Sequence, residues 1–177
     1  LYMGTLQPRK NLPALIEAYA QIKNDIPEIK VVLTGNRAAR NFDKKIDAAV
    51  EKFHQEDRIV FSGFIDEADK KAIFKLASVF CFPSFYEGFG IPVLEAMASG
   101  VPVVASNIAP HREICDDAAL LFDFGDNQDL AKKLKLVLTD EDLRGKLKTK
   151  GVAQAQKFSW ENSAIKLKEI FGSLKKD

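Results

Sequence analysis

Two kinds of hydrophobic pattern alternate along the chain. Short, continuous apolar runs such as IKVVLTG (29–35) and VFCFPS (79–84) predict strands that are buried on both faces. Amphipathic stretches with helical spacing, such as NLPALIEAYAQIKND (11–25), lie between them. The predicted strands are 1–4, 29–35, 58–63, 79–84, 101–106 and 119–124. The predicted helices are 11–25, 42–55, 66–78, 91–99, 110–117 and almost all of the chain from 128 onward.

This alternation predicts an α/β fold. Apolar strands separated by helices form a parallel sheet, and right-handed crossovers place helices on both of its faces. We therefore expect residues 1–177 to form a single domain, a doubly wound, Rossmann-like parallel sheet with a helical C-terminal tail. Ligands of such sheets bind beyond the carboxyl ends of the strands. At those ends the chain has Gly4, Gly35, Gly63, Ser84 and Ser106.

Composition and charge exclude several classes of protein. The chain has 26 Lys and Arg against 25 Asp and Glu, so the net charge of +1 gives no electrostatic reason to expect a nucleic acid partner. The sequence contains no apolar run of bilayer length and no signal-peptide pattern. A cytoplasmic protein is the expectation. The last residues, LKKD (174–177), are predicted to be solvated, and contact with a membrane surface is the alternative.

Metal and redox chemistry are not expected either. Cys81 and Cys115 lack the spacing of a metal or redox motif, and Cys81 is predicted to be a buried thiol. We expect His54 and His111 to be surface or helix-end residues and not catalytic ones. No cluster of His, Cys and Asp has the spacing of a metal site.

The stretch YEGFGIPVLEAMASG carries the candidate chemistry. Glu87 follows a predicted strand, and Gly88 and Gly90 permit a close backbone approach to a ligand. Pro92 suits the first turn of a helix, whose free amides attract an anion such as a phosphate. Glu95 lies one turn into that helix and tilts back toward its start.

Free amides between two carboxylates suit a ligand that has both a phosphate and many hydroxyls. A nucleotide sugar is such a ligand. The alternative is that Glu87 is a solvated loop acid and Glu95 an exposed helix acid near a favourable dipole end. The spacing of two acids alone leaves both interpretations open.

The segment EGFGIPVLEAMASGVPVVAS resembles the signature of the retaining glycosyltransferases of family 4, which have the two-domain GT-B fold. The opening LYMGTLQPRKNLPALIEAY, the middle segment RIVFSGFIDEADKKAIFKLASVFCFPSFYEGFG and the closing KFSWENSA are also similar to that family. The resemblance covers nearly the whole chain.

The resemblance implies a role for each matching residue. Glu87 would contact hydroxyls of the donor sugar, Glu95 the ribose hydroxyls, and Lys10 the diphosphate. Main-chain amides would meet the sugar and the diphosphate at Gly88, Phe89, Gly90 and Ile91. The alternative for Lys10 is a surface lysine ahead of a helix.

Four further positions are less clear. Many family members have an arginine where this chain has Thr5, which leaves the diphosphate one charge short unless Arg9 turns inward. A solvated Arg9 is the alternative. Ile65 would face the nucleobase with its main chain. Lys70 would approach the same place, although it fits a solvated position equally well.

The resemblance implies that this chain is the donor-binding, C-terminal half of a hexosyltransferase, with the acceptor site in an absent N-terminal domain. The full enzyme would transfer a sugar from a UDP- or GDP-sugar to an acceptor hydroxyl, with retention and without metal, in polysaccharide, lipopolysaccharide or glycolipid assembly. A mannosyltransferase is one such enzyme, and the motifs leave the sugar open. The chain alone would not transfer sugar. It would be cytoplasmic, with the inner face of the membrane as a second location. The alternatives are a nucleotide-sugar epimerase of the same fold and a non-catalytic binding module.

Overall fold

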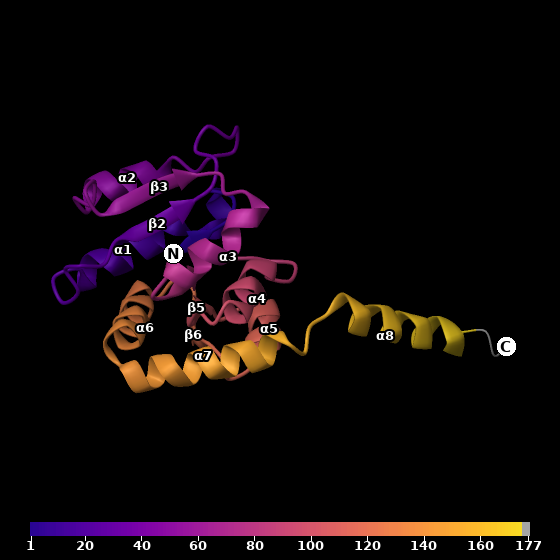
Figure 1. Ribbon diagram of the computed structural model, residues 1–177. Helices are drawn as coiled ribbons and strands as arrows, with labels where there is room; N and C mark the ends of the chain where they lie inside the picture. Colours follow the sequence, from indigo (N-terminus) through magenta and orange to yellow (C-terminus); the bar gives the residue numbers. More distant parts are fainter. Residues whose placement is uncertain (175–177) are drawn as a thin grey trace.

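Six short parallel strands form the centre of the computed structural model, which describes residues 1–174 (Figure 1). They form two three-stranded sheets, β1-β2-β3 and β4-β5-β6. The strands are β1 (Tyr2–Met3), β2 (Val31–Thr34), β3 (Ile59–Gly63), β4 (Phe80–Phe82), β5 (Val103–Ser106) and β6 (Leu120–Phe122). The helices are η1 (Pro8–Lys10), α1 (Leu12–Ile22), α2 (Lys45–Lys52), α3 (Glu67–Leu76), α4 (Ile91–Ala98), α5 (Ala109–Cys115), α6 (Asn127–Thr139), α7 (Glu141–Ala155) and α8 (Trp160–Ser173).

Backbone hydrogen bonds of Leu1 join the two sheets side by side. The Leu1 nitrogen donates to the Val79 carbonyl over 2.9 Å, and the Cys81 amide donates to the Leu1 carbonyl over 2.9 Å. The strands therefore run in the order β3-β2-β1-β4-β5-β6, and the winding reverses between β1 and β4. This order confirms the predicted doubly wound, Rossmann-like fold. It also identifies the carboxyl ends of β1 and β4 as the expected place for a ligand.

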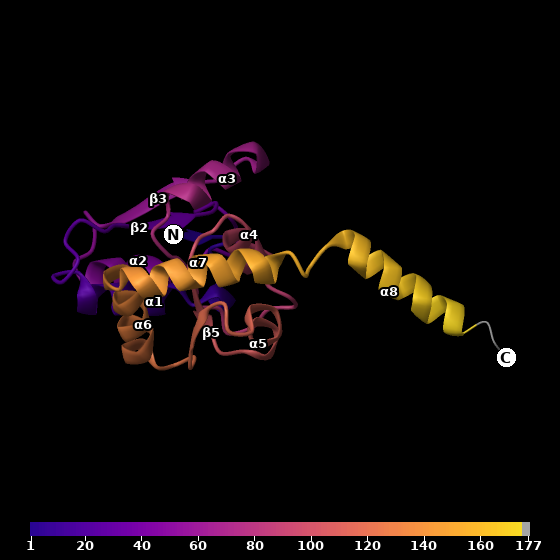
Figure 2. The ribbon, with the colours of Figure 1, turned by 60° about the horizontal axis from the view of Figure 1, so that its bottom comes forward.

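Helices cover the sheet through their apolar sides. Helix α1 buries Leu12, Leu15, Ile16 and Tyr19, and it packs against α2 and α6. Helix α7 contacts α4, α5 and α6 and crosses the body of the molecule (Figure 2). Strand β4, in the middle of the sheet, is fully buried. Such burial on both faces explains why its sequence is continuously apolar.

The edge strand β3 differs from the prediction of strands buried on both faces. Its residues alternate between buried and more exposed positions, and Val60 is 40% exposed. Successive side chains of a strand point to opposite faces of the sheet, so this alternation indicates that one face of β3 is covered less than the other.

The C-terminal tail is helical, as predicted, but it is broken into three helices. The carboxylates of Asp126 and Asp140 accept hydrogen bonds from backbone amides at the starts of α6 and α7. The Ser159 hydroxyl accepts such a hydrogen bond at the start of α8. Such caps mark helix starts that the hydrophobic pattern alone does not show. Helix α8 projects from the body and buries no side chain (Figure 1). The predicted solvated ending LKKD lies, apart from Leu174, outside the described residues.

The two cysteines of the chain, Cys81 and Cys115, are both buried. Cys81 is 2% exposed, and burial raises the pKa of its thiol to about 12, which confirms the prediction of a buried thiol. Burial raises the pKa of Cys115 to about 12 as well. Within the part of the chain that the structure describes, no helix is both long enough and apolar enough to cross a bilayer.

Candidate functional site

The turn between β4 and α4 lies at the predicted place in the sheet. Gly90 caps α4 with φ 109°, a left-handed conformation that glycine adopts without strain. A Cβ atom added to Gly88 would meet nothing within 4 Å, so this backbone is open to a ligand. Within residues 1–174, no backbone or side-chain acceptor binds the amides of Gly88, Phe89, Gly90 and Ile91. Four free amides beside a helix start form an anion-binding surface.

Glu87 begins this turn and binds two cations from the loop after β1. Its carboxylate accepts a hydrogen bond of 2.5 Å from Lys10 Nζ and one of 3.0 Å from Arg9 Nη1. Lys10 is only 5% exposed and Glu87 only 9%, whereas the Arg9 side chain is 43% exposed. The Arg9 carbonyl also accepts the Phe85 amide over 2.8 Å. Helix η1 and the β4–α4 turn are therefore one connected unit.

The buried ion pair changes the acidity of both partners. Burial alone would raise the pKa of Glu87, but the hydrogen bonds from Lys10 and Arg9 outweigh it, and the pKa lies below its usual value. Burial lowers the pKa of Lys10, and the hydrogen bond to Glu87 opposes that shift. The Lys10 ammonium also lies 4.7 Å from the centroid of the Phe82 ring. Glu87 and Lys10 are therefore not the solvated residues of the alternative interpretation.

Glu95 has a partner on the opposite side of the turn. Lys70 of α3 donates to Glu95 Oε1 over 3.2 Å and to the exposed Glu67 over 2.7 Å. The Lys70 side chain is 28% exposed and that of Glu95 is 31% exposed, so both remain within reach of a ligand. The structure thus brings together Lys70 and Glu95, which are separated by 25 residues in the sequence.

Two further predicted residues, Thr5 and Ile65, lie at the same edge of the sheet. Within residues 1–174 their side chains form no hydrogen bond or ion pair. Thr5 is exposed after β1, and its carbonyl accepts the Tyr2 hydroxyl over 2.7 Å. Ile65 is half-buried after β3. Neither residue joins the Lys10–Glu87 or the Lys70–Glu95 pair.

His111 lies in the first turn of α5, so the prediction of a helix-end residue is confirmed, but the prediction of a surface position was wrong. The side chain is fully buried, because the side of α5 that carries it packs on the sheet, with the ring 5.6 Å from that of Phe82. Two serines at strand ends are buried with it. The Ser106 hydroxyl donates to the Ser84 carbonyl over 2.5 Å. The strand-end positions of both serines are visible in the sequence, but nothing there shows that Ser106 contacts His111. His54, by contrast, is exposed as predicted.

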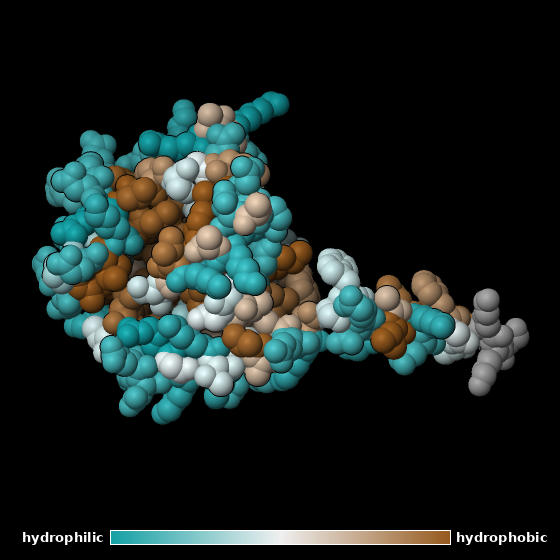
Figure 3. Space-filling model, in the orientation of Figure 1, coloured by the Kyte–Doolittle hydropathy of each residue, from teal (hydrophilic) through white to brown (hydrophobic). Residues whose placement is uncertain are grey.

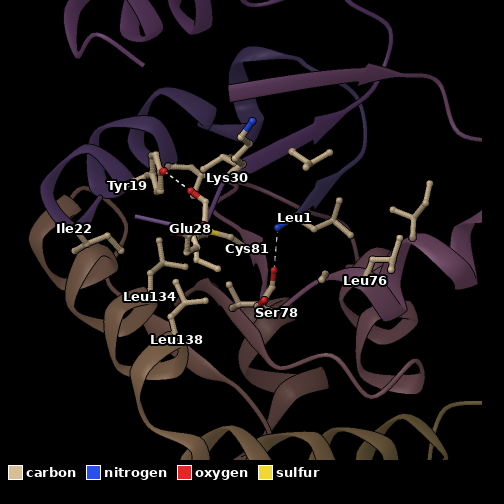
Figure 4. A pocket seen from close by; sticks show the side chains of 17 residues that line it. Leu1, Tyr19, Ile22, Glu28, Lys30, Leu76, Ser78, Cys81, Leu134 and Leu138 are labelled. Carbon is tan, nitrogen blue, oxygen red and sulfur yellow. Dashed lines mark hydrogen bonds between the residues drawn. The ribbon is translucent and has the colours of Figure 1, made fainter. Parts of the chain in front are cut away.

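Among the hollows outside this polar cluster, two have mostly apolar walls. One, of about 250 Å³, lies at the opposite edge of the sheet, among side chains that include Tyr19, Ile22 and Leu134 (Figure 4). It corresponds to the apolar depression on the face that carries the N-terminus in Figure 3. The other, of about 610 Å³, adjoins the turn between Phe89 and Trp160. Apolar walls do not suit a charged phosphate.

The fold is that of an α/β domain of the GT-B type. A family model described as glycosyl transferases group 1 matches residues 1–154, and the chain belongs to this family. The O-antigen chain mannosyltransferase B of Escherichia coli is 37% identical over 163 residues, which are 92% of this chain and 42% of that protein. The chain therefore spans less than half the length of this curated relative.

Solved structures agree with the fold. A structure of HepE from Anabaena in complex with UDP and glucose is 25% identical, with a TM-score of 0.85 over 97% of this chain and 47% of that one. The C-terminal domain of a glycosyl transferase group 1 family protein (LpcC) from Francisella tularensis is 27% identical, with a TM-score of 0.77. That alignment covers 88% of this chain and 83% of the LpcC domain.

Proposed function

We propose that this chain is the donor-binding domain of a retaining glycosyltransferase of family 4. The full enzyme would transfer a sugar from a nucleotide diphosphate sugar to an acceptor hydroxyl, in polysaccharide, lipopolysaccharide or glycolipid assembly. The observation that carries the proposal is the buried Lys10–Glu87 pair beneath a turn of free amides. The mannosyltransferase relative and the UDP complex of the HepE neighbour support it.

The diphosphate would bind where positive charge and free amides meet. The ammonium of Lys10 and the amides of Gly90 and Ile91 would contact its oxygens, with Arg9 as a further cation. These groups would stabilise the negative charge on the departing diphosphate without a bound metal. Because Lys10 and Arg9 already bind Glu87, donor binding would exchange part of these ion pairs for phosphate contacts.

Two carboxylates would bind hydroxyls. Glu87 would orient the sugar, and its lowered pKa keeps it in the acceptor form at neutral pH. Glu95 would accept hydrogen bonds from the ribose hydroxyls. Lys70 would then either move away from Glu95 or share the carboxylate with the ribose. The main chain near Ile65 would face the nucleobase.

The reaction would need no basic side chain from this domain. The bond between the anomeric carbon of the sugar and the diphosphate oxygen breaks, and the acceptor oxygen bonds to that carbon on the same face. The departing phosphate oxygen takes the proton of the acceptor hydroxyl. The chain's part is to hold the diphosphate and to orient the sugar.

The rest of the enzyme would supply the acceptor site. This chain aligns with most of the LpcC C-terminal domain and with 42% of the mannosyltransferase relative. Helix α8 leaves Trp160, Ile170 and Phe171 exposed and buries none of its residues, which suits contact with another part of the protein. The fragment alone would therefore bind the donor but not transfer sugar. A cytoplasmic enzyme, peripheral to the membrane, would match such a role.

A non-catalytic binding module is the second candidate. The exposed Thr5, where many members have an arginine, favours it. Restoring the missing half of the enzyme and measuring sugar transfer would separate the two candidates. A nucleotide-sugar epimerase would instead release an isomerised nucleotide sugar in the same assay.

We expect the 177-residue chain to bind UDP or GDP in the presence of EDTA, with a dissociation constant on the order of tens of micromolar to millimolar. Binding would be weak because Arg9, Lys70 and Glu95 are partly exposed to water, where each charged contact contributes less. Amide NMR shifts should gather at residues 5–10, 63–67 and 86–95. Binding that requires magnesium, or shifts concentrated elsewhere, would contradict the proposed donor site.

The substitution Glu95→Ala should weaken ribonucleotide binding about fivefold, because a half-exposed carboxylate contact contributes about 1 kcal/mol. The 2′,3′-dideoxy analogue should lose little affinity, since it lacks the hydroxyls that Glu95 would bind. Calorimetry of both ligands measures the difference. Glu67→Ala is the matched control, because it removes the other, exposed partner of Lys70. Equal losses for both ligands would assign Glu95 a role unrelated to ribose.

A further inference from the structure

His111 lies directly beneath the anion-binding turn. If Gly90 carried a Cβ atom, that atom would lie 3.3 Å from His111 Cδ2 and 3.5 Å from His111 Nε2. The Nε2 atom is buried and has no hydrogen-bond partner within residues 1–174. Buried side-chain nitrogens are rarely left without a partner, so this one calls for an explanation.

The other ring nitrogen is held in a fixed state. His111 Nδ1 lies 2.9 Å from the Ser106 carbonyl oxygen, which can only accept a hydrogen bond, so Nδ1 carries the proton. Ser106 Oγ lies 3.3 Å from the same nitrogen and gives its own proton to the Ser84 carbonyl. Protonation can therefore change only at Nε2, the atom that faces the turn.

The surroundings of the ring contain few charges. Phe82 of β4 and Ser106 of β5 are uncharged, and α7 contributes the uncharged Gln154, which binds the Ile114 carbonyl. Of the charged groups, Glu87 favours the imidazolium and Lys10 opposes it. Burial lowers the pKa of His111 and is the largest cause of the shift, so the free protein has a neutral imidazole at pH 7.

A bound diphosphate would reverse this balance. On the side of η1, the free site holds two cations, Arg9 and Lys10, against one carboxylate, Glu87, while Lys70 and Glu95 form a separate pair. The diphosphate of a nucleotide sugar carries one negative charge on each phosphate, which exceeds the single uncompensated cation. Anions close to a buried imidazole favour its charged form. The Ser84 hydroxyl is also buried and has no hydrogen-bond partner within residues 1–174. The Ser84 carbonyl accepts a hydrogen bond from Ser106, whose hydroxyl lies beside His111 Nδ1.

We propose that His111 is a proton-coupled positioning residue of this site: when a nucleotide diphosphate sugar binds over the turn, Nε2 takes up a proton from solvent. The new N–H bond forms with a proton of the buffer, and it breaks again when the ligand leaves. The imidazolium beneath Gly90 then supplies positive charge that the free site lacks. This inference rests on the proposed donor site and assigns it a pH dependence.

The first test is NMR of the imidazole protons of the unmodified 177-residue chain from pH 5 to 8. The chain has two histidines, and the exposed His54 serves as an internal control. Saturating UDP-glucose or GDP-mannose should raise the pKa of His111 by about 1, which is a tenfold gain in proton affinity. The signals of His54 should not respond to the ligand. Nucleotide sugars are used because their doubly esterified diphosphate does not titrate in this range, unlike the terminal phosphate of UDP.

The second test is the affinity of the same ligands by calorimetry. Because the bound state holds the additional proton, affinity should rise as pH falls, about three- to tenfold from pH 7.5 to 5.5. Calorimetry in two buffers of different ionisation enthalpy should detect the proton uptake. The variants His111→Gln and His111→Phe should lose both the pH dependence and the uptake. A residue that served only to pack the fold would change affinity equally at every pH.

The outcomes separate this inference from the proposed function. If nucleotide sugars bind but the titration of His111 is unaltered, or the pH dependence persists in both variants, the inference is wrong and the donor site stands. If no nucleotide sugar binds at any pH, the proposed donor site falls and the inference with it. The NMR test needs no variant, so it decides the matter even if the substitutions prevent folding.

Discussion

Replacing Lys10 with methionine is expected to weaken the binding of nucleotide diphosphates about ten- to a hundredfold. A charge-assisted contact to a phosphate contributes roughly 1.5–3 kcal/mol, and each 1.4 kcal/mol is about tenfold in affinity. Lys10 is buried beside the free amides, so solvent screens its charge less than that of a surface lysine. Binding of the nucleosides uridine and guanosine should hardly change. Calorimetry with UDP, GDP and the two nucleosides measures both effects.

The variant also removes the closest partner of a buried carboxylate. Glu87 would keep only the partly exposed Arg9 as a cation, so the free energy of unfolding should fall by about 1–3 kcal/mol. Thermal unfolding establishes that the variant is folded at the temperature of the binding measurement. Lys30→Met is the matched control, because it makes the same change in charge at an exposed position on the opposite edge of the sheet. A similar loss of affinity in both variants would show a general effect of net charge and remove Lys10 from the site.

The substitution Gly35→Ala is expected to lower the free energy of unfolding by about 2–6 kcal/mol. Gly35 has φ 140°, outside the range that alanine readily adopts, and the added Cβ atom would lie 2.3 Å from the Gly4 carbonyl oxygen. That oxygen belongs to the backbone, so relief requires the ends of β1 and β2 to move apart. Backbone strain and overpacking each cost roughly 1–3 kcal/mol. Urea denaturation measures the loss.

Gly145→Ala provides the opposite case. Gly145 lies on the exposed side of α7, and an added Cβ atom would meet nothing within 4 Å. Alanine should therefore stabilise this helix by about 0.5–1 kcal/mol. Equal changes in the free energy of unfolding for the two substitutions would contradict the close approach of the ends of β1 and β2. That approach lies next to the loop that carries Thr5 and Lys10.

The local elements of this protein could be predicted because their causes are local. The strand VFCFPS is continuously apolar since both of its faces are covered, and Pro92 and Gly90 mark the start of α4 within the segment that contains them. The alternation of such strands and helices admits few folds other than a doubly wound sheet. Because ligands of such sheets bind beyond the carboxyl ends of the strands, the order of the elements also predicts which edge would hold a ligand. It does not predict which side chains meet at that edge.

The sequence alone therefore determined the succession of strands and helices, the parallel sheet and the two acids on either side of a turn of free amides. The tertiary structure decided the partners of those residues. Lys10 and Glu87 are 77 positions apart, and only the meeting of β1 and β4 brings their side chains to 2.5 Å. His111 looked like a surface residue because no local pattern records that α5 packs it beneath Gly90. Local patterns reflect which face of an element is apolar, whereas contacts between distant residues depend on how the whole chain closes around one core.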